Sequence, residues 1–307
     1  MINRVLIRLK VVQIVYAYYK NSGKTIKATE DEVFFSLSKA YDLYNYMLLL
    51  MVGITHYATD RISFLSMKIR PTESDRNPNL KFVNNRFIAQ LESNEQLAKF
   101  AEKSKLNWVD NSDLLRRLLD TIEDSDIYKE YMASETSSYE EDKEVWRKLY
   151  KAFIFDNEEL DSLLEEQSLY WNDDKSIVDS FVLKTIKRFE EKNGAAQQLL
   201  PEYKDVADME FARKLFRNAI ANADQYRELM GTSSKNWDMS RLAFMDVVIM
   251  QVALAEIMSF DDVPLSVTLN EYVEIAKHYS TVKSGSFVNG MLDTITKRLR
   301  QENKINK

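Results

Sequence analysis

The chain has no cysteine and only 6 glycines and 4 prolines among its 307 residues. Without cysteine it can form neither a disulfide nor a thiolate metal site, which fits a reducing compartment. Strand-rich folds need turn residues at short intervals, and so few glycines and prolines do not supply them. The composition therefore predicts an all-α protein.

A long apolar run is also missing. The richest apolar stretch extends from Leu43 to Ile54, well short of the about 20 residues that span a bilayer. The first residues show neither the apolar block nor the small-residue cleavage site of a signal peptide. We therefore expect a cytoplasmic protein that makes no membrane contact.

Residues that commonly carry catalysis are sparse. The two histidines, His56 and His278, lie far apart in the sequence, and neither stands in a zinc-ligand or HExxH pattern. The glycines form no phosphate loop and no dinucleotide-binding turn, because those motifs need several glycines within one short stretch. We expect no enzyme activity, no cofactor and no metal site.

Charge is distributed unevenly along the chain. The formal net charge is −6, which argues against non-specific nucleic-acid binding by the whole molecule. No acidic residue precedes Glu30, whereas acidic residues outnumber basic ones between Asp120 and Lys175. The N-terminal segment is therefore the first candidate for a phosphate contact. Its basic residues are Arg4, Arg8, Lys10, Lys20, Lys24 and Lys27.

Apolar residues recur at helical spacing over most of the chain. Asn3 is placed to cap the first helix, and the spacing of Thr29 and Glu32 is that of a capping box. Two segments interrupt the periodicity, a loop over 67–81 and a linker over 199–205. Between these features the pattern predicts helices over 3–20, 29–61, 82–103, 107–132, 139–155, 157–171 and 174–192, and a further one after 206.

The segment 239–260 is apolar on almost every side. A helix that is apolar all round is buried all round, so we expect it to form the centre of a bundle. Pro264 ends it, since proline has no amide hydrogen and disfavours helical geometry in the preceding residue. A second helix follows from Leu265 or Ser266, and a last amphipathic helix runs to Leu299 after a turn at 281–286.

This C-terminal region resembles the NusB family of RNA-binding proteins. The matching positions are Trp237-x-x-x-Arg241-Leu242, Asp246-x-x-Ile249, Ala253-x-x-Glu256, Asp262-Val263-Pro264, Asn270-Glu271-x-x-Glu274-x-Ala276-Lys277 and Ser284-x-x-Phe287-Val288-Asn289-Gly290-x-Leu292-Asp293. A weaker likeness to the family's first helix lies at Val12-Gln13-x-x-Tyr16. The resemblance implies a NusB-like helical bundle with a large helical insertion after the first helix. We divide the chain into the first helix (1–28), the insertion (29–200), the C-terminal bundle domain (206–300) and a tail (301–307).

Two groups of residues are the candidate RNA contacts. Arg4 and Arg8 are four residues apart and so share one helix face, with Lys10 beside them. The resemblance implies that this basic helix contacts RNA, although Val5, Leu6 and Ile7 replace part of the family's denser basic run. It implies the same for the turn that carries Lys283, Ser286 and Phe287, where an aromatic ring at a helix start can stack on an unpaired base.

Other residues of the matching region have a structural interpretation. Val288 and Leu292 are expected in the core, and the pair Asn289-Gly290 is expected to allow close helix packing. The alternative for Phe287 is that it belongs to the core. Four charged residues on apolar helices should pair with one another or cap helix ends, because charges seldom lie unpaired in a core. They are Arg241, Asp246, Glu256 and Glu271.

The resemblance implies a transcription antitermination factor that recognises single-stranded, boxA-like RNA of ribosomal RNA transcripts. Its implied partners are the ribosomal protein NusE and the RNA polymerase antitermination complex. A second hypothesis is a helical interaction scaffold, whose acidic insertion docks a basic partner and which binds little RNA. The two differ in salt dependence, because binding through phosphates weakens steeply as salt is raised.

Overall fold

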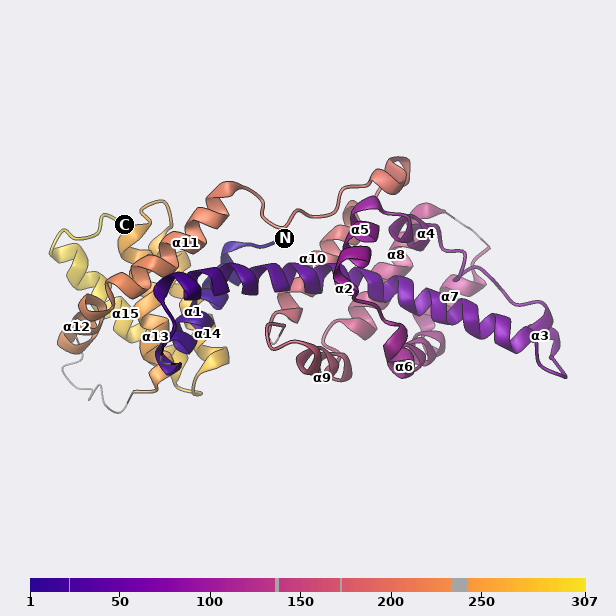
Figure 1. The fold of residues 1–307 in the computed structure, drawn as a ribbon, viewed down its shortest axis with the longest axis horizontal. Coiled ribbons are helices and arrows are strands. Elements are labelled where there is room, and N and C mark those ends of the chain that lie inside the picture. Colours follow the sequence, from indigo (N-terminus) through magenta and orange to yellow (C-terminus); the bar gives the residue numbers. More distant parts are fainter. Residues whose placement is uncertain (22, 136–137, 172, 234–241) are drawn as a thin grey trace. The chain divides into compact units, whose positions relative to one another are not determined.

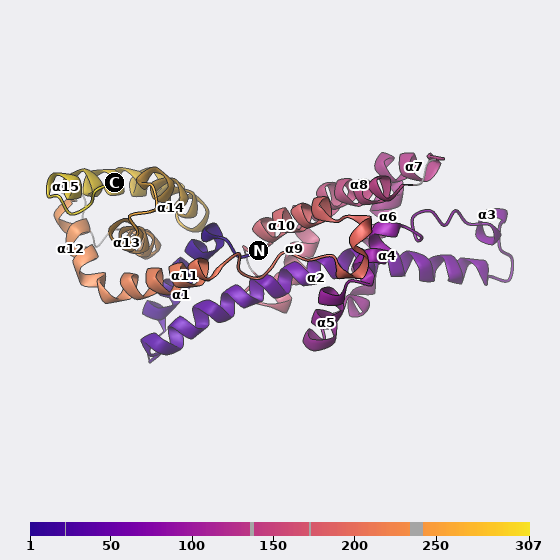
Figure 2. The ribbon, with the colours of Figure 1, turned by 90° about the horizontal axis from the view of Figure 1, so that it is seen from above.

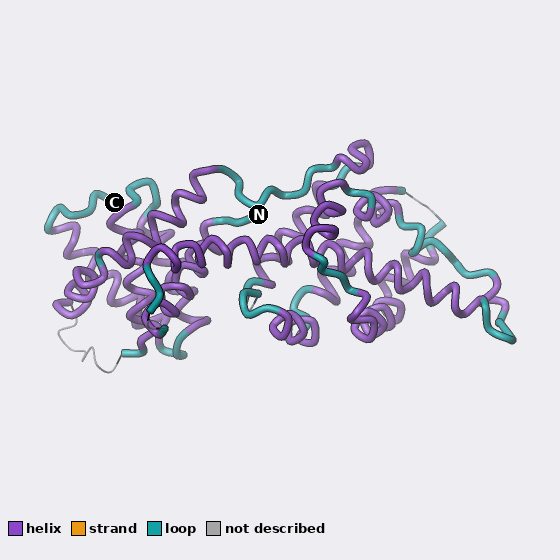
Figure 3. The backbone as a smooth tube through the Cα atoms, in the orientation of Figure 1, coloured by secondary structure: helices purple, strands orange, loops and turns teal. Residues whose placement is uncertain are grey.

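The computed structural model describes residues 1–21, 23–135, 138–171, 173–233 and 242–307. Helices joined by turns and loops make up these ranges, as Figure 1 and Figure 3 show. Their β-type pairing is confined to an isolated bridge between Ile2 and Tyr203. The prediction of an all-α fold is confirmed. None of the described helices combines the length and the apolarity needed to cross a membrane.

The chain forms two compact units. One consists of Met1 and Lys39–Glu202, and we call it the insertion unit. The other consists of Ile2–Ser38 and Tyr203–Lys307, and we call it the bundle unit. The predicted boundary after residue 28 falls inside the helix α2 (Ile26–Ser66), which contributes residues to both units. The predicted linker over 199–205 contains the second junction, Glu202–Tyr203.

The bundle unit is built around one buried helix. Its elements are α1 (Arg4–Lys20), the first part of α2, α11 (Val206–Ala221), α12 (Ala223–Ser233), α13 (Phe244–Ser259), α14 (Leu265–Tyr279) and α15 (Ser284–Gln301). Five of these helices, α1, α11, α12, α14 and α15, pack against α13, which Figure 2 shows nearly end-on with neighbours around it. Every α13 residue from Val248 to Ile257 is buried, as its all-round apolar sequence predicts. The predicted start at 239–241 lies outside the described residues.

The insertion unit contains the longer part of α2 and many short helices. They are α3 (Glu73–Arg76), α4 (Arg86–Glu92), α5 (Glu95–Ser104), η1 (Val109–Asn111), α6 (Ser112–Asp124), α7 (Asp126–Ala133), α8 (Tyr139–Leu149), the π-helical η2 (Tyr150–Ile154), α9 (Glu158–Gln167), α10 (Lys175–Arg188) and η3 (Glu191–Ala196). Aromatic residues fill its core. Trp146, Tyr44 and Tyr46 are essentially inaccessible to solvent, as we would expect for large apolar side chains in a well-packed core.

Several predicted helix boundaries are wrong because polar residues cap helices within an apolar pattern. The helix α2 starts before Thr29, where the Thr25 hydroxyl oxygen accepts a hydrogen bond from the Ala28 amide at 3.2 Å. Thr29 therefore lies inside the helix and makes no capping box with Glu32. Asn94 separates α4 from α5, and Ser125 separates α6 from α7. Each was predicted inside one continuous helix.

Asn94 does more than cap α5. Its side-chain oxygen accepts from the amides of Gln96 and Leu97, each at 3.1 Å. Its amide nitrogen donates to the carbonyl oxygen of Gln197 at 2.7 Å, and the side chain is completely buried. Asn94 thus joins the start of α5 to a segment about a hundred residues later in the chain.

Replacing Asn94 with alanine should lower the free energy of unfolding by about 2–3 kcal/mol, because it removes a cap and leaves a buried carbonyl unsatisfied. Urea denaturation of the full chain measures this. Asn3→Ala is the control, since the Asn3 side chain caps α1 through a single amide, that of Leu6, and should cost about 1 kcal/mol. Equal losses in the two variants would contradict the bridging role of Asn94.

Candidate nucleic-acid interface

The candidate RNA-binding residues of α1 surround a buried ion pair. Arg8 Nε donates to Glu256 Oε2 and Arg8 Nη2 to Glu256 Oε1, both at 2.8 Å. The hydroxyl groups of Thr268 and Tyr272 donate to the same carboxylate at 2.8 and 3.0 Å. Glu256 is fully buried, and the Arg8 side chain is 3% exposed. Four hydrogen bonds therefore satisfy a carboxylate in the centre of the bundle unit.

The electrostatics of this cluster follow from its burial. Burial alone would lower the pKa of Arg8, but the hydrogen bonds and charge of Glu256 more than offset it, and the pKa is raised. Burial, reinforced by the negative charge of Glu256, raises the pKa of Tyr272 far above its ordinary value. Arg8 therefore stays charged and Tyr272 stays a hydrogen-bond donor throughout the accessible pH range.

The prediction that Arg8 and Lys10 belong to an exposed basic face is wrong. Each is 2% exposed, and every residue of α1 from Leu6 to Val12 is buried. The helix packs against α11 and α13 and also contacts α14, so it has no solvent-exposed face between Leu6 and Val12. The apolar run at Val5, Leu6 and Ile7 already marks a helix that is enclosed on several sides.

Arg4 remains at the surface. Its side chain is 36% exposed, and its Nη1 lies 3.4 Å from Asp262 Oδ2. Its Nε lies 3.9 Å from Asp208 Oδ1, and its guanidinium carbon sits 4.7 Å from the centre of the Phe211 ring. Pairs of this exposure are weak, so Arg4 can exchange these acidic partners for a phosphate at low cost.

The second candidate group lies at the start of α15. Lys283 and Ser286 are exposed, and Phe287 is half-buried. Ser284 is buried, and its hydroxyl donates to Asp246 Oδ2 at 2.9 Å while accepting from the Thr281 amide at 3.0 Å. This fixes the turn onto α13 and leaves Lys283 exposed at the start of α15.

The structural predictions for the matching region hold in part. Val288 and Leu292 are fully buried, as predicted. Asn289 is exposed, and a β-carbon built at Gly290 would meet no atom within 4 Å, so the prediction of close packing at this pair is wrong. Their positions face away from the neighbouring helices.

Arg241 is the only basic residue among the four charged residues, so their pairing with one another stays a prediction, whereas two of the three acids have other partners. Asp246 is held by Ser284, and Glu256 pairs with Arg8. Glu271 lies at the margin of that pair, with its Oε2 4.0 Å from Arg8 Nη1. Arg241 lies outside the described residues. The first helix therefore supplies the counter-charge that local spacing within the C-terminal region could not reveal.

The six predicted contacts do not form one patch. Arg4 pairs with Asp262, just beyond the C-terminal end of α13, whereas the turn at 281–287 is fixed to Asp246, in the first turn of α13. Sixteen helical residues at 1.5 Å each separate the two ends by about 24 Å along the axis.

A lysine and several aromatic rings that our sequence-based site did not include gather near the N-terminal end of α13, the end to which the turn at 281–287 is fixed. Lys20 Nζ lies 4.6 Å from the centre of the Phe244 ring and 5.6 Å from that of Tyr16. Tyr18 and Tyr19 follow at 5.5 Å from each other. Tyr16, Tyr18 and Tyr19 are partly exposed and Lys20 is exposed. The signal was present in the sequence as an aromatic run beside a lysine.

Comparison with known proteins finds similarity to NusB proteins over the C-terminal part of the chain. The NusB family model matches residues 180–297. A transcription antitermination protein NusB from Salinibacter ruber is 35% identical over 132 residues, which are 41% of this chain and 82% of that protein. Its counterpart from Chloroherpeton thalassium is 34% identical over 39% of this chain and 58% of its own length.

A solved structure of T. maritima NusB is also similar. It shares 32% identity over 38% of this chain and 82% of that chain, with a TM-score of 0.29. The fold and the site together define an all-helical bundle protein whose first helix is locked to its central helix by a buried Arg8–Glu256 pair. The chain belongs to the NusB family.

Proposed function

We propose that this chain is a non-catalytic transcription antitermination factor that binds boxA-like single-stranded RNA together with NusE, within the RNA polymerase antitermination complex. Its relatives carry the name transcription antitermination protein NusB. We further propose that the bundle unit performs this task and that most of 29–200 is an insertion into it. The observation that carries the RNA-binding part is the exposed Lys283 on a turn held by buried polar bonds.

The turn suits a phosphate for two independent reasons. The first amides of an α-helix have no partner within the helix and carry the positive end of its dipole. The helix α15 is 18 residues long, and no side chain caps its first turn from Lys283. Lys283 adds a full positive charge at the same end. A phosphate placed there meets both, and Ser286 offers a hydroxyl.

The cluster of Lys20, Tyr16 and Tyr18 extends the proposed interface. Partly exposed aromatic rings beside a cation are a platform on which unpaired bases stack, at about 1–3 kcal/mol per base. With the turn of Lys283 at the same end of α13, this arrangement supplies phosphate contacts and base stacking. Arg4 would then contact RNA only where the strand continues toward the other end of α13.

The test is binding to a boxA-like RNA and to a scrambled RNA at two salt concentrations, with and without NusE. We expect tighter binding to the boxA-like RNA and a further gain with NusE. Lys283→Ala should weaken binding about tenfold and flatten the dependence of log K on log salt by about 0.7, the value for one phosphate contact with a single strand.

Lys297→Ala is the matched control. Lys297 also lies on α15 and is 67% exposed, but it pairs with Asp293 near the other end of the helix. We expect its affinity and salt slope to equal those of the unaltered chain. Equal binding of boxA-like and scrambled RNA under all four conditions would refute the proposed function. An equal loss of RNA affinity in Lys283→Ala and Lys297→Ala would show that the turn does not contact the RNA.

A further inference from the structure

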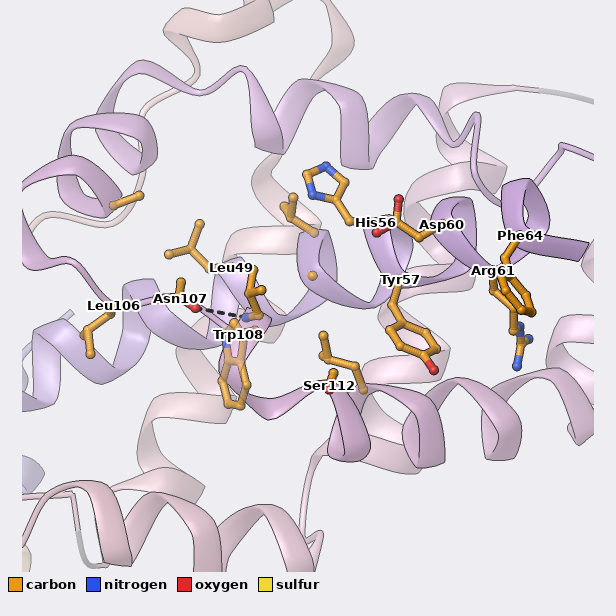
Figure 4. Close-up of a pocket in the computed structure, with 15 residues that line it drawn as sticks. Leu49, His56, Tyr57, Asp60, Arg61, Phe64, Leu106, Asn107, Trp108 and Ser112 are labelled. Atoms are coloured by element: carbon orange, nitrogen blue, oxygen red, sulfur yellow. Dashed lines mark hydrogen bonds between the residues drawn. The ribbon is translucent and has the colours of Figure 1, made fainter. Parts of the chain in front are cut away.

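The insertion unit contains an elongated groove, separate from the proposed RNA interface. It has a volume of about 560 Å³ and runs along α2 from Leu49 to Phe64. Its lining residues on α2 recur at spacings of three and four, so they share one side of the helix. The opposite wall comes from the segment between Leu106 and Leu115, and Figure 4 shows both walls. Fifteen helical steps make the groove about 22 Å long.

The floor of the groove is rigid. Trp108 Nε1 donates to the Tyr46 carbonyl at 2.9 Å, and the two rings stack with centres 4.1 Å apart. Gly53 packs closely against Trp108, because a β-carbon at position 53 would come within 3.2 Å of the Trp108 β-carbon. The groove is therefore formed before any ligand arrives, which reduces the entropy that binding must overcome.

Large apolar side chains are exposed at its edges. Phe64 is 72% exposed and Val109 is 78% exposed, and both line the groove. Met67 and Ile69 follow Phe64 closely in the chain and are 82% and 100% exposed. Exposed apolar side chains that line a groove mark an interaction site. A small molecule inside the groove would leave these edge residues in water, whereas a protein segment would cover them.

The charges of the groove are complementary to a cationic partner. Asp60 lines the groove and makes no hydrogen bond or ion pair with any of the described residues. Arg61 is neutralised, since its Nη1 lies 2.7 Å from Asp120 Oδ1 and its Nη2 also pairs with Glu123. His56 Nε2 lies 2.8 Å from Glu92 Oε1. Figure 4 shows His56 and Asp60 projecting together from α2. Asp60 and Arg61 are the charged lining residues, and the acidic partners Glu92, Asp120 and Glu123 beside the groove add an excess of negative charge at its margin.

We propose that this groove binds an amphipathic helix of a partner protein, with an apolar stripe at i, i+3, i+4 and i+7 and with lysine or arginine on its flank. Length, exposed apolar edges and a helical pattern of lining residues fit a helix laid parallel to α2. Asp60 receives one of the cationic side chains. The proposal concerns the insertion unit alone and holds or fails independently of RNA binding.

The test uses two synthetic helical peptides with the same leucine stripe, one with lysine and one with glutamate on the polar face. Binding to the full chain is measured by peptide fluorescence anisotropy. We expect micromolar binding of the lysine peptide and at least tenfold weaker binding of the glutamate peptide. Asp60→Asn should weaken the lysine peptide about tenfold, as for a lost charge-assisted hydrogen bond. Phe64→Glu should weaken both peptides.

Leu169→Glu is the matched control, because Leu169 is 84% exposed in the same unit but does not line the groove. It should bind the lysine peptide like the unaltered chain. Failure of the lysine peptide to bind, equal binding of both peptides, or equal losses in Phe64→Glu and Leu169→Glu would overturn the proposal. The proposal would also be overturned if the chain self-associates and Phe64→Glu abolishes this association, because a second copy of the chain would then occupy the groove.

Discussion

Replacing Glu256 with alanine should lower the free energy of unfolding by about 3–5 kcal/mol, the usual loss when one partner of a buried ion pair is removed. The Arg8 guanidinium, 3% exposed, would keep its charge and lose both hydrogen bonds to the carboxylate. The hydroxyl groups of Thr268 and Tyr272 would lose their acceptor as well. Urea denaturation of the full chain at neutral pH measures the change.

Glu271→Ala provides the comparison. Glu271 is 29% exposed and its carboxylate oxygen lies 4.0 Å from Arg8 Nη1, so its removal should cost less than about 1 kcal/mol. The double variant Arg8→Met, Glu256→Met should recover part of the loss, because it leaves no unpaired charge in the core. A loss below 1 kcal/mol in Glu256→Ala would show that water reaches the pair.

The second large effect is expected at Lys175 in the insertion unit. Its Nζ donates to Asp179 Oδ2 and to the Ile154 carbonyl, both at 2.7 Å. The Tyr150 hydroxyl donates to the other oxygen of the fully buried Asp179 at 2.5 Å. Replacing Lys175 with methionine should lower the free energy of unfolding by about 3–5 kcal/mol at pH 7, since it leaves the Asp179 carboxylate buried without its counter-charge.

This loss should depend on pH. Burial raises the pKa of Asp179 above its ordinary value, although Lys175 and Tyr150 both act to lower it. Without Lys175 the pKa rises further. A group with a raised folded-state pKa contributes stability below its unfolded value, about 3.9 for aspartate, and that contribution disappears as pH rises through the folded value. The deficit of Lys175→Met should therefore be smallest near pH 4 and grow toward neutrality.

Denaturation of Lys175→Met and of the unaltered chain, compared at a series of pH values, measures this dependence. The control is the double variant Lys175→Met, Asp179→Asn, which has no ionisable group at position 179. The additional pH dependence should vanish in it. A deficit that is constant from pH 4 to pH 8, or that grows on acidification, would show that Asp179 does not remain buried in the variant.

Helical periodicity was sufficient to predict most helices of this chain, and all-round apolarity was sufficient to predict that α13 is central. The breaks at Asn94 and Ser125 were missed because apolar residues continue at helical spacing across both caps. A cap of this kind forms only when the side-chain oxygen accepts hydrogen bonds from the amides that follow it in the chain. For Asn94 this side-chain conformation is stabilised by the hydrogen bond to the Gln197 carbonyl, which is distant in sequence.

The candidate site was less accessible to sequence reasoning. Spacing correctly put Arg4 and Arg8 four residues apart on a helix, but it could not show that a carboxylate 248 positions later, Glu256, draws Arg8 into the core. The burial of Val288 was predicted correctly because it agrees with the apolar pattern of its own helix. Arg8 and Lys10 were predicted wrongly because packing against helices distant in sequence sets their environment.

The helix α2 supplies core residues to both units, among them Val33 and Leu37 before the junction at Ser38–Lys39 and Leu43 and Tyr44 after it. Adding or deleting a single residue within either packed stretch would rotate the side chains that follow it in that unit by about 100° around the helix axis and bring polar residues to core positions. The other junction, Glu202–Tyr203, lies in a non-helical segment. Length variation among relatives should therefore accumulate there, while each packed stretch of α2 keeps a constant number of residues.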